Sequence, residues 1–289
     1  MPALAWVNGR FGPIAALGVP VEDRGLQFAD AVYEVVAVLA GTPFDWAPHA
    51  ERLQRNLAAL RIEGAPSARA LELVVRSLLG RARIDDGLLH LQVTRGVARR
   101  DHAFPPRTRP TVAITVRPFD FRRRLGLQRE GVTAISRPDP RWKRCDLKTT
   151  NLLGAVLAKE DARNQGAFEA LFLDPQGHVT EGASTNVWLV DRAGRLVTHP
   201  PTAAILAGVA RGTLLRLARA QGYTVDERPF TLHEAQRAAE LFLTSTTAPV
   251  IPIVRLDGAE IGQGRPGPVA RHLAQLMWAE VARQTGWRP

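Results

Sequence analysis

All the lysines of this sequence lie in one short segment. Lys143, Lys148 and Lys159 are the three lysines among 38 lysine and arginine residues. Arginine serves wherever a solvated positive charge is needed, but its guanidinium keeps its proton and cannot attack a carbonyl. A lysine kept in such a chain is therefore a candidate amine nucleophile, able to form an imine with an aldehyde or ketone.

Lys148 is the best placed of the three. Lys159 falls in a helical pattern beside two acidic residues, where a solvated helix face is expected, and Lys143 lies in a charged turn. Lys148 ends an extended segment and precedes residues 149–151, which are candidate helix N-caps. The positive end of a helix dipole at that point would favour the neutral amine that acts as a nucleophile.

Two further stretches could support such an amine. Glu181 in "VTEGASTN" follows strand residues and precedes Gly182. Taken alone, it indicates a bulge glycine beside an exposed glutamate. Thr244–Thr247, "TSTT", could bind an anion through hydroxyl and amide groups, or could simply end a strand. A third stretch, "GQGRPG" at 262–267, matches a dinucleotide-binding pattern only formally. Pro266 and the following Pro268 remove amide donors, so we expect a loop before the last helix.

The pattern of apolar residues predicts an α+β protein with two domains. Residues 1–120 contain an Asn-Gly hairpin near the start, alternating β-branched strands, and helices over about 47–60 and 67–82. Residues 121–130 are charged without a clear period, and we expect an interdomain linker. Residues 131–289 contain further strands, with helices over about 149–166 and 205–222.

Bulk composition narrows the class of protein. The chain is 45% hydrophobic and 23% charged, which is ordinary for a globular protein. It has no apolar run long enough for a membrane span and no signal-like start, and the single Cys145 excludes an internal disulfide framework, so we expect a cytoplasmic location. The net charge of +10 would suit nucleic acid, but the arginines are scattered and no nucleic-acid-binding motif is found. A basic enzyme with anionic substrates fits equally well.

Seven motifs together resemble one enzyme family. "DRGLQFADAVYEVV", "HAERL", "VTRGVARRDHAFP", "RWKRCDLKTTNLLGAVLAKE", "VTEGASTNVWLV", "THPPTAAILAGVARG" and "LFLTSTTAPVIPI" occur in the order and spacing of the fold type IV pyridoxal-phosphate (PLP) enzymes. The resemblance covers nearly the whole chain, and "RRDH" resembles the members that act on D-amino acids. It implies a smaller N-terminal α/β domain at 1–120 and a larger, β-barrel-like, PLP-binding C-terminal domain at 131–289. It also implies a homodimer in which the partner chain contributes to the site, with His102 as a candidate for that contribution.

The resemblance also implies a role for each site residue. Lys148 would bind the PLP aldehyde as a Schiff base and act as the catalytic residue, and Glu181 would keep the pyridine nitrogen protonated. The cofactor phosphate would be held by Arg52, by Ser245 and Thr246, and by the helix start near Gly208 and Val209. Further expected cofactor-binding residues are Arg141, Ser184, Asn186 and Leu206, and the substrate carboxylate would be bound by Tyr33, Arg100 and His102. No metal is expected.

The chain departs from the family pattern at three positions. Val209 and Ala210 stand where the family usually has a residue pair ending in threonine. This chain therefore lacks one side-chain hydroxyl that would contact the cofactor phosphate. Ala37 replaces a usual lysine, and Ala183 a usual serine.

We expect transamination between a D-amino acid such as D-alanine and a 2-oxo acid such as 2-oxoglutarate. Alternatives of the same fold are branched-chain L-aminotransferase, (R)-amine transaminase and aminodeoxychorismate lyase. A nucleic-acid-binding protein is the alternative from another class; neither nucleic acid nor membrane is expected as a partner.

Overall fold

The computed structural model describes residues 3–288, which form two compact units. Unit 1 consists of the described residues up to Asp120, with Leu147–Asn151 and Gln284–Trp287. Unit 2 consists of Phe121–Asp146, Leu152–Arg283 and Arg288. Unit 1 therefore ends its long segment at residue 120, and it also takes in the five residues around Lys148, which were expected in the C-terminal domain.

The segment expected to be a linker is a helix. Helix α4 covers Arg122–Glu130 and belongs to unit 2. Its buried Gln128 donates a hydrogen bond to the carbonyl oxygen of Val250 (2.7 Å) and accepts one from the indole nitrogen of Trp278 (2.8 Å). The run of arginines hid this helix from periodicity, because its one buried residue is the polar Gln128 and Leu127 is only partly buried against the core of unit 2.

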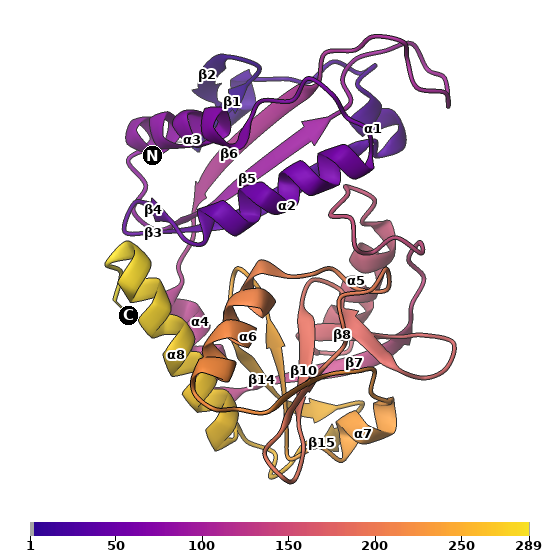
Figure 1. Cartoon of the computed structure of the whole chain (residues 1–289), viewed down its shortest axis with the longest axis vertical. Helices are drawn as coiled ribbons and strands as arrows, with labels where there is room; N and C mark the ends of the chain where they lie inside the picture. The colour runs from indigo at the N-terminus through magenta and orange to yellow at the C-terminus, as the bar shows by residue number, and fades with distance from the viewer. Residues whose placement is uncertain (1–2, 289) are drawn as a thin grey trace. The chain divides into compact units, whose positions relative to one another are not determined.

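Unit 1 is a six-stranded antiparallel sheet with two helices on one face (Figure 1). The strands follow the order β2-β1-β6-β5-β3-β4. The elements are β1 (Leu4–Val7), β2 (Arg10–Pro13), the 3-10 helix η1 (Ile14–Ala16), α1 (Arg24–Phe28), β3 (Ala31–Leu39), β4 (Thr42–Pro43), α2 (Trp46–Ala59), α3 (Ala68–Ala82), β5 (Gly87–Thr94) and β6 (Thr111–Pro118).

The hairpin and the two helices predicted for residues 1–120 are all present in unit 1. The predicted hairpin joins β1 to β2, with Asn8 and Gly9 both at positive φ (44° and 96°), as a tight two-residue turn requires. Both predicted helices are present, and α3 has Ser67 as its N-cap. Alternation along β3 turns Val32 and Val36 into the core under α2 and α3 and places Tyr33 on the other face of the sheet.

Unit 2 has a nine-stranded mixed sheet in the order β12-β11-β10-β13-β14-β7-β8-β9, with β15 paired to β14. Its edge strand β9 also approaches β10, so the sheet curls on itself. The remaining elements are β7 (Val132–Pro138), α5 (Leu153–Asn164), β8 (Glu169–Leu173), β9 (Val179–Gly182), β10 (Asn186–Val190), β11 (Leu196–Thr198), α6 (Val209–Ala220), β12 (Val225–Glu227), α7 (Leu232–Gln236), β13 (Glu240–Thr244), β14 (Ile251–Leu256), β15 (Ala259–Glu260) and α8 (Pro268–Thr285).

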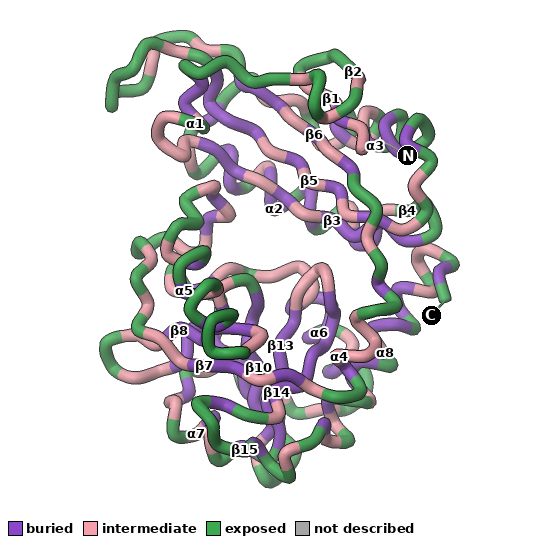
Figure 2. Tube along the Cα trace, turned by 180° about the vertical axis from the view of Figure 1, so that it is seen from behind, coloured by how far each residue is buried: buried purple, intermediate pink, exposed green. Residues whose placement is uncertain are grey.

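Both faces of the unit 2 sheet are covered, so its central strands are buried along their whole length (Figure 2). On one face Trp188 and Phe242 stack (5.7 Å between centroids) among residues of α6 and α8. On the other face Leu189 and Leu243 pack with Phe230. This explains why these strands read as continuous apolar runs rather than alternating ones.

The α+β fold class is confirmed. Among residues 3–288, no helix is long and apolar enough to cross a membrane.

Candidate active site

Lys148 lies in an added edge segment of unit 1. The backbone amide of Tyr33 donates to the carbonyl oxygen of Lys148 (3.0 Å), and the amide of Thr150 donates to that of Ala31 (3.2 Å). Residues 148–150 therefore run beside the start of β3. The prediction that residues 149–151 cap a helix is wrong: α5 begins at Leu153, with no side-chain cap. The backbone hydrogen bonds of the segment go to β3 instead, so Lys148 is placed by a strand and not by a helix end.

The amine of Lys148 contacts Tyr33 directly. Nζ lies 3.3 Å from the phenol oxygen and 4.3 Å from the ring centroid. His90 on β5 stacks against the same ring, with centroids 5.5 Å apart. Burial lowers the pKa of His90, and the charge of Lys148 lowers it further. His90 was not among the predicted site residues. Alternation on β5 placed it on a sheet face, but only the strand pairing showed that this face also carries Tyr33.

A buried ion pair sits on the other face of β3. Glu34 accepts two hydrogen bonds from Arg52 (Nε and Nη2, both 2.7 Å) and one from His49 Nδ1 (2.7 Å). Burial raises the pKa of Glu34, but the hydrogen bonds and charges of Arg52 and His49 outweigh this effect and lower it to about 2. Burial lowers the pKa of His49. Glu34 therefore fixes the guanidinium of Arg52, the residue expected to bind phosphate, in one orientation.

The two residues of the expected substrate clamp lie around one aromatic ring. Arg100 and His102 are both exposed. The guanidinium of Arg100 is 4.7 Å from the centroid of Phe28, and the ring of His102 is 5.5 Å from it. Two side chains able to bind a carboxylate thus lie against the ring of Phe28 and are exposed.

Glu181 in unit 2 is buried rather than exposed, which corrects the interpretation of its motif as a bulge with an exposed glutamate. One carboxylate oxygen accepts from Arg141, and the other accepts from Asn186 Nδ2 (3.1 Å) and from the backbone amide of Leu206 (3.0 Å). Asp139 holds the other side of Arg141 (2.7 Å). Burial lowers the pKa of Arg141, but its bonds to Asp139 and Glu181 outweigh this and raise it. The result is a carboxylate of fixed orientation.

Asn186 connects this carboxylate to the start of α6. Its side-chain amide also donates to the carbonyl oxygen of Leu206 (2.9 Å). A Cβ at Gly208 would lie 2.1 Å from Asn186 Oδ1, so only glycine permits this approach. Gly208 is the N-cap of α6 and provides no side-chain cap. The first amides of α6, including that of Val209, are therefore available to an anion.

The end of β13 lies beside the same asparagine. Thr244, the last residue of β13, pairs with Asn186, so Ser245 and Thr246 follow directly. Ser245 Oγ is within 3.3 Å of Thr247 Oγ1 and of the Ala248 carbonyl and amide. Hydroxyl and amide groups from two segments of unit 2, the start of α6 and this loop, are thus brought to Asn186.

Ser184 and Lys159 have structural partners. Buried Glu169 accepts hydrogen bonds from Ser184 Oγ (2.9 Å), Thr185 Oγ1 (3.2 Å) and Lys159 Nζ (3.1 Å). Lys159 is therefore not simply a residue of a solvated helix face. Its amine is paired with the buried carboxylate of Glu169 and is therefore not the candidate nucleophile. The sequence alone did not show this pairing.

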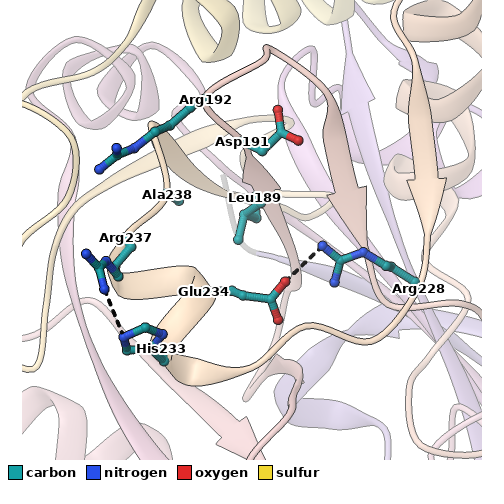
Figure 3. A pocket seen from close by; sticks show the side chains of 8 residues that line it. All are labelled: Leu189, Asp191, Arg192, Arg228, His233, Glu234, Arg237 and Ala238. Atoms are coloured by element: carbon teal, nitrogen blue, oxygen red, sulfur yellow. Dashed lines mark hydrogen bonds and ion pairs between the residues drawn. The ribbon is translucent and has the colours of Figure 1, made fainter.

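Unit 2 also contains a separate pocket of about 400 Å³. Figure 3 shows its lining side chains, among them Glu234 paired with Arg228 (2.9 Å) and Arg237 beside His233 (3.4 Å). None of the candidate site residues lines it, and one of its acidic side chains, Glu234, is already paired with Arg228. It is therefore separate from the residues that would bind cofactor and substrate.

The residues present fit PLP in chemical type. Unit 1 carries an amine able to form an imine with an aldehyde, and unit 2 carries a buried carboxylate suited to a protonated ring nitrogen. Unit 2 also has an uncapped helix start whose glycine leaves room for a close approach. In the described part of the chain, no group of three or more metal-ligating side chains is found.

The mixed α+β fold, the amine and the buried carboxylate together suggest a PLP-dependent enzyme, and comparison with known proteins gives its class. The model of the family "Amino-transferase class IV" matches residues 31–256, so the chain belongs to the class IV aminotransferases. It is 38% identical over 278 residues to D-alanine aminotransferase of Bacillus licheniformis, covering 96% of this chain and 97% of that protein.

Solved structures agree on the fold. The branched-chain amino acid aminotransferase of Escherichia coli has a TM-score of 0.90 at 25% identity, covering 99% of this chain and 96% of that one. That of Thermoproteus uzoniensis, solved with norvaline, has a TM-score of 0.84 at 25% identity, covering 98% of this chain and 97% of that one. The predicted family and fold type IV architecture are confirmed, and the family implies dependence on PLP.

Proposed function

We propose that this chain catalyses PLP-dependent transamination between a D-amino acid, such as D-alanine, and a 2-oxo acid, such as 2-oxoglutarate. The observation that carries the proposal is the 38% identity to a D-alanine aminotransferase over almost the whole of both chains. The position of Arg100 and His102 around one ring supports it, because both substrates carry an α-carboxylate. The basic net charge of +10 also suits anionic substrates.

PLP supplies an aldehyde that binds the substrate amine and a ring that delocalises the charge left when the Cα–H bond breaks. In the proposed reaction, Lys148 would hold the cofactor aldehyde through Nζ. Once free, the same amine would take the proton that leaves Cα and return it to complete the amine transfer. The phenol of Tyr33, 3.3 Å from Nζ, orients the amine for this proton transfer.

Glu181 and the residues around it hold the cofactor ring. Its carboxylate, oriented by Arg141, Asn186 and the amide of Leu206, stabilises a proton on the ring nitrogen by its opposite charge. Ser184 is proposed as a neighbouring cofactor contact. The phosphate is proposed to bind to Arg52, to the start of α6 at Gly208 and Val209, and to Ser245 and Thr246.

Stereochemistry follows from the carboxylate clamp. If Arg100 and His102, with Tyr33, hold the α-carboxylate on one side, only one enantiomer directs its Cα hydrogen toward Lys148. The test is a panel of D- and L-amino acid donors against 2-oxoglutarate. D-Alanine should yield pyruvate and L-alanine should not. Turnover of L-amino acids alone would overturn the proposed specificity, and a protein that fails to bind PLP would overturn the proposed reaction.

A branched-chain L-aminotransferase is the second candidate, because the E. coli and T. uzoniensis structures have TM-scores of 0.90 and 0.84. Their 25% identity is lower than the 38% to the D-alanine enzyme. The same panel separates the two, since L-leucine would then be the better donor.

We also propose that the protein is a homodimer. Helix α5 exposes Leu153 (67%), Val156 (57%) and Leu157 (59%), which share one helix face by their spacing. An apolar face of this kind, exposed in a single chain, is typical of an interface. A cytoplasmic location is proposed as well, in keeping with the one free cysteine, Cys145.

A further inference from the structure

A buried arginine binds the segment that carries the proposed substrate clamp. Arg24, the first residue of α1, is only 3% exposed. Its Nη1 donates to the carbonyl oxygens of Asp101 (2.6 Å) and Ala103 (3.3 Å), and its Nη2 lies 3.5 Å from that of His102. One guanidinium therefore contacts three consecutive carbonyls of an exposed segment. The planar fork of five donors makes this possible, and the single ammonium of lysine could not reproduce it.

The guanidinium of Arg24 is itself fixed on its other edge. Its Nε donates to Asp30 Oδ2 (2.8 Å), and the same oxygen accepts from Arg95 Nε (2.7 Å). Arg95 in turn donates to the carbonyl oxygens of Leu60 (2.8 Å) and Arg61 (2.7 Å), at the end of α2. Asp30 thus joins Arg24, through Arg95, to the end of α2.

The side chains of the clamp rest on the same helix. Phe28, the last residue of α1, has the guanidinium of Arg24 4.7 Å from its ring centroid, at the same distance as that of Arg100. His102 contacts the ring as well. Helix α1 therefore holds the segment twice, through its carbonyls by Arg24 and through its side chains by Phe28.

The base of the segment is joined to α1 by the backbone. The amide of Arg24 donates to the carbonyl oxygen of Gly96 (2.9 Å), and the amide of Ala98 donates to that of Glu22 (3.2 Å). A Cβ at Gly25 would lie 2.4 Å from Thr94 Cγ2, so α1 packs closely on the end of β5. The connection from β5 to β6 covers residues 95–110, and a connection of that length keeps one conformation only when it is anchored in this way.

We propose that Arg24, supported by Asp30 and Phe28, is a positioning residue that fixes the Arg100–His102 segment and so sets how tightly the substrate carboxylate is bound. The inference rests on the proposed function, because it takes Arg100 and His102 as the carboxylate clamp. It adds that the clamp is pre-organised by a buried residue that does not touch substrate. Pre-organisation lowers the ordering cost of binding, so its loss raises KM.

The test compares Arg24→Lys with the wild-type holoenzyme and with Arg76→Lys. Arg76 is an exposed arginine on α3 that pairs with Glu72, and it serves as the matched control. Arg24→Lys should raise the KM for both D-alanine and 2-oxoglutarate about tenfold or more, with kcat within about threefold and PLP affinity unchanged. Arg76→Lys should leave all of these values as in the wild type. An unchanged KM in a folded Arg24→Lys enzyme would overturn the proposal.

Hydrogen exchange provides a readout that does not depend on activity. In Arg24→Lys, amides in 97–104 should exchange at least about tenfold faster, while amides of β5 keep their wild-type rates. If the wild type transaminates nothing, the proposed function fails, yet exchange still decides whether Arg24 anchors the segment. If Arg24→Lys unfolds, Phe28→Leu is used instead. It removes the ring but keeps an apolar side chain, and it should raise both KM values severalfold; an unchanged KM there would equally overturn the proposal.

Discussion

At the scale of single residues, several proposed site residues are charged or amine-bearing side chains, each with its orientation set by a neighbouring side chain. Lys148 has Tyr33, Arg52 has Glu34, and Glu181 has Arg141. A charged side chain on a flexible stem loses entropy when it binds a ligand, and a bound neighbour removes part of that cost in advance.

Lys148→Ala should abolish the covalent attachment of PLP. The wild-type protein with PLP should be yellow, and borohydride should link the cofactor to Lys148, because only that lysine lies beside the phenol of Tyr33. Absorbance spectra and peptide mass analysis provide the measurement. Lys143→Ala, an exposed lysine, is the control and should remain yellow. Labelling of any other residue would contradict the assignment.

Glu34→Gln should destabilise the fold in a pH-dependent way. The folded-state pKa of Glu34 is about 2, below its usual value of 4.5. A lowered carboxylate pKa contributes stability above about pH 4.5 that is lost as the pH falls towards 2. At pH 7 the variant should lose about 3 kcal/mol of unfolding free energy, since each pKa unit is worth about 1.4 kcal/mol.

Urea unfolding of both proteins at pH 7 and pH 3 tests this effect. The difference between wild type and Glu34→Gln should shrink at pH 3. Glu72→Gln, which breaks an exposed pair with Arg76, should cost about 0.5 kcal/mol or less at either pH. A pH-independent loss in Glu34→Gln would mean that packing, and not charge, is what the substitution removes.

At the scale of elements, the start of α6 and the end of β13 are brought together by one asparagine. Asn186 pairs with Thr244 across the sheet and bonds to the carbonyl of Leu206 just before α6. Gly208 leaves the space this contact needs. The strand pairing therefore decides where the uncapped amides of α6 lie, although the helix itself follows from local sequence.

Ala210→Thr should strengthen PLP binding. Ala210 is the second residue of α6, near the uncapped amides proposed to hold the phosphate. A threonine hydroxyl there would add one hydrogen bond, worth about 1 kcal/mol, or about fivefold in Kd. Fluorescence titration of the apoprotein measures it. Ala220→Thr, at the far end of the same helix, controls for helix propensity and should leave Kd unchanged. An unaltered Kd in Ala210→Thr would place the phosphate elsewhere.

At the scale of the whole molecule, the two units divide the chemistry between them. Unit 1 carries the amine and the proposed clamp, and unit 2 carries the carboxylate and the proposed phosphate amides. The chain leaves unit 2 at Asp146, adds Leu147–Asn151 to the sheet of unit 1, and returns at Leu152. The five residues Leu147–Asn151 therefore bring Lys148, the proposed reactive amine, into unit 1.

Leu153→Glu should shift the proposed homodimer to monomer. A carboxylate on this apolar face of α5 would be desolvated in the interface, at a cost of several kcal/mol. Light scattering coupled to size exclusion measures the mass. Leu73→Glu is the matched control, since Leu73 is a leucine of α3 with 63% exposure and lies outside that face. A dimer that persists in Leu153→Glu would place the interface elsewhere.

Much of this protein could be predicted from sequence because its signals are local. The spacing of apolar residues predicted α2 and α3, and the Asn-Gly pair predicted the first hairpin. The segment of α4 was predicted to be a linker because its arginines show no apolar period, and the hydrogen bond from its buried Gln128 goes to Val250, far along the chain.

The sequence by itself determined the family, the fold class and the chemical types of the proposed reactive groups, since these depend on residue type and short-range spacing. Only the tertiary structure decided their partners. It placed Lys148 on an edge of β3, stacked His90 on Tyr33, buried Glu181, and brought Arg24 to a carbonyl 77 positions away. Such contacts arise from strand register and packing between distant segments, which no local pattern encodes.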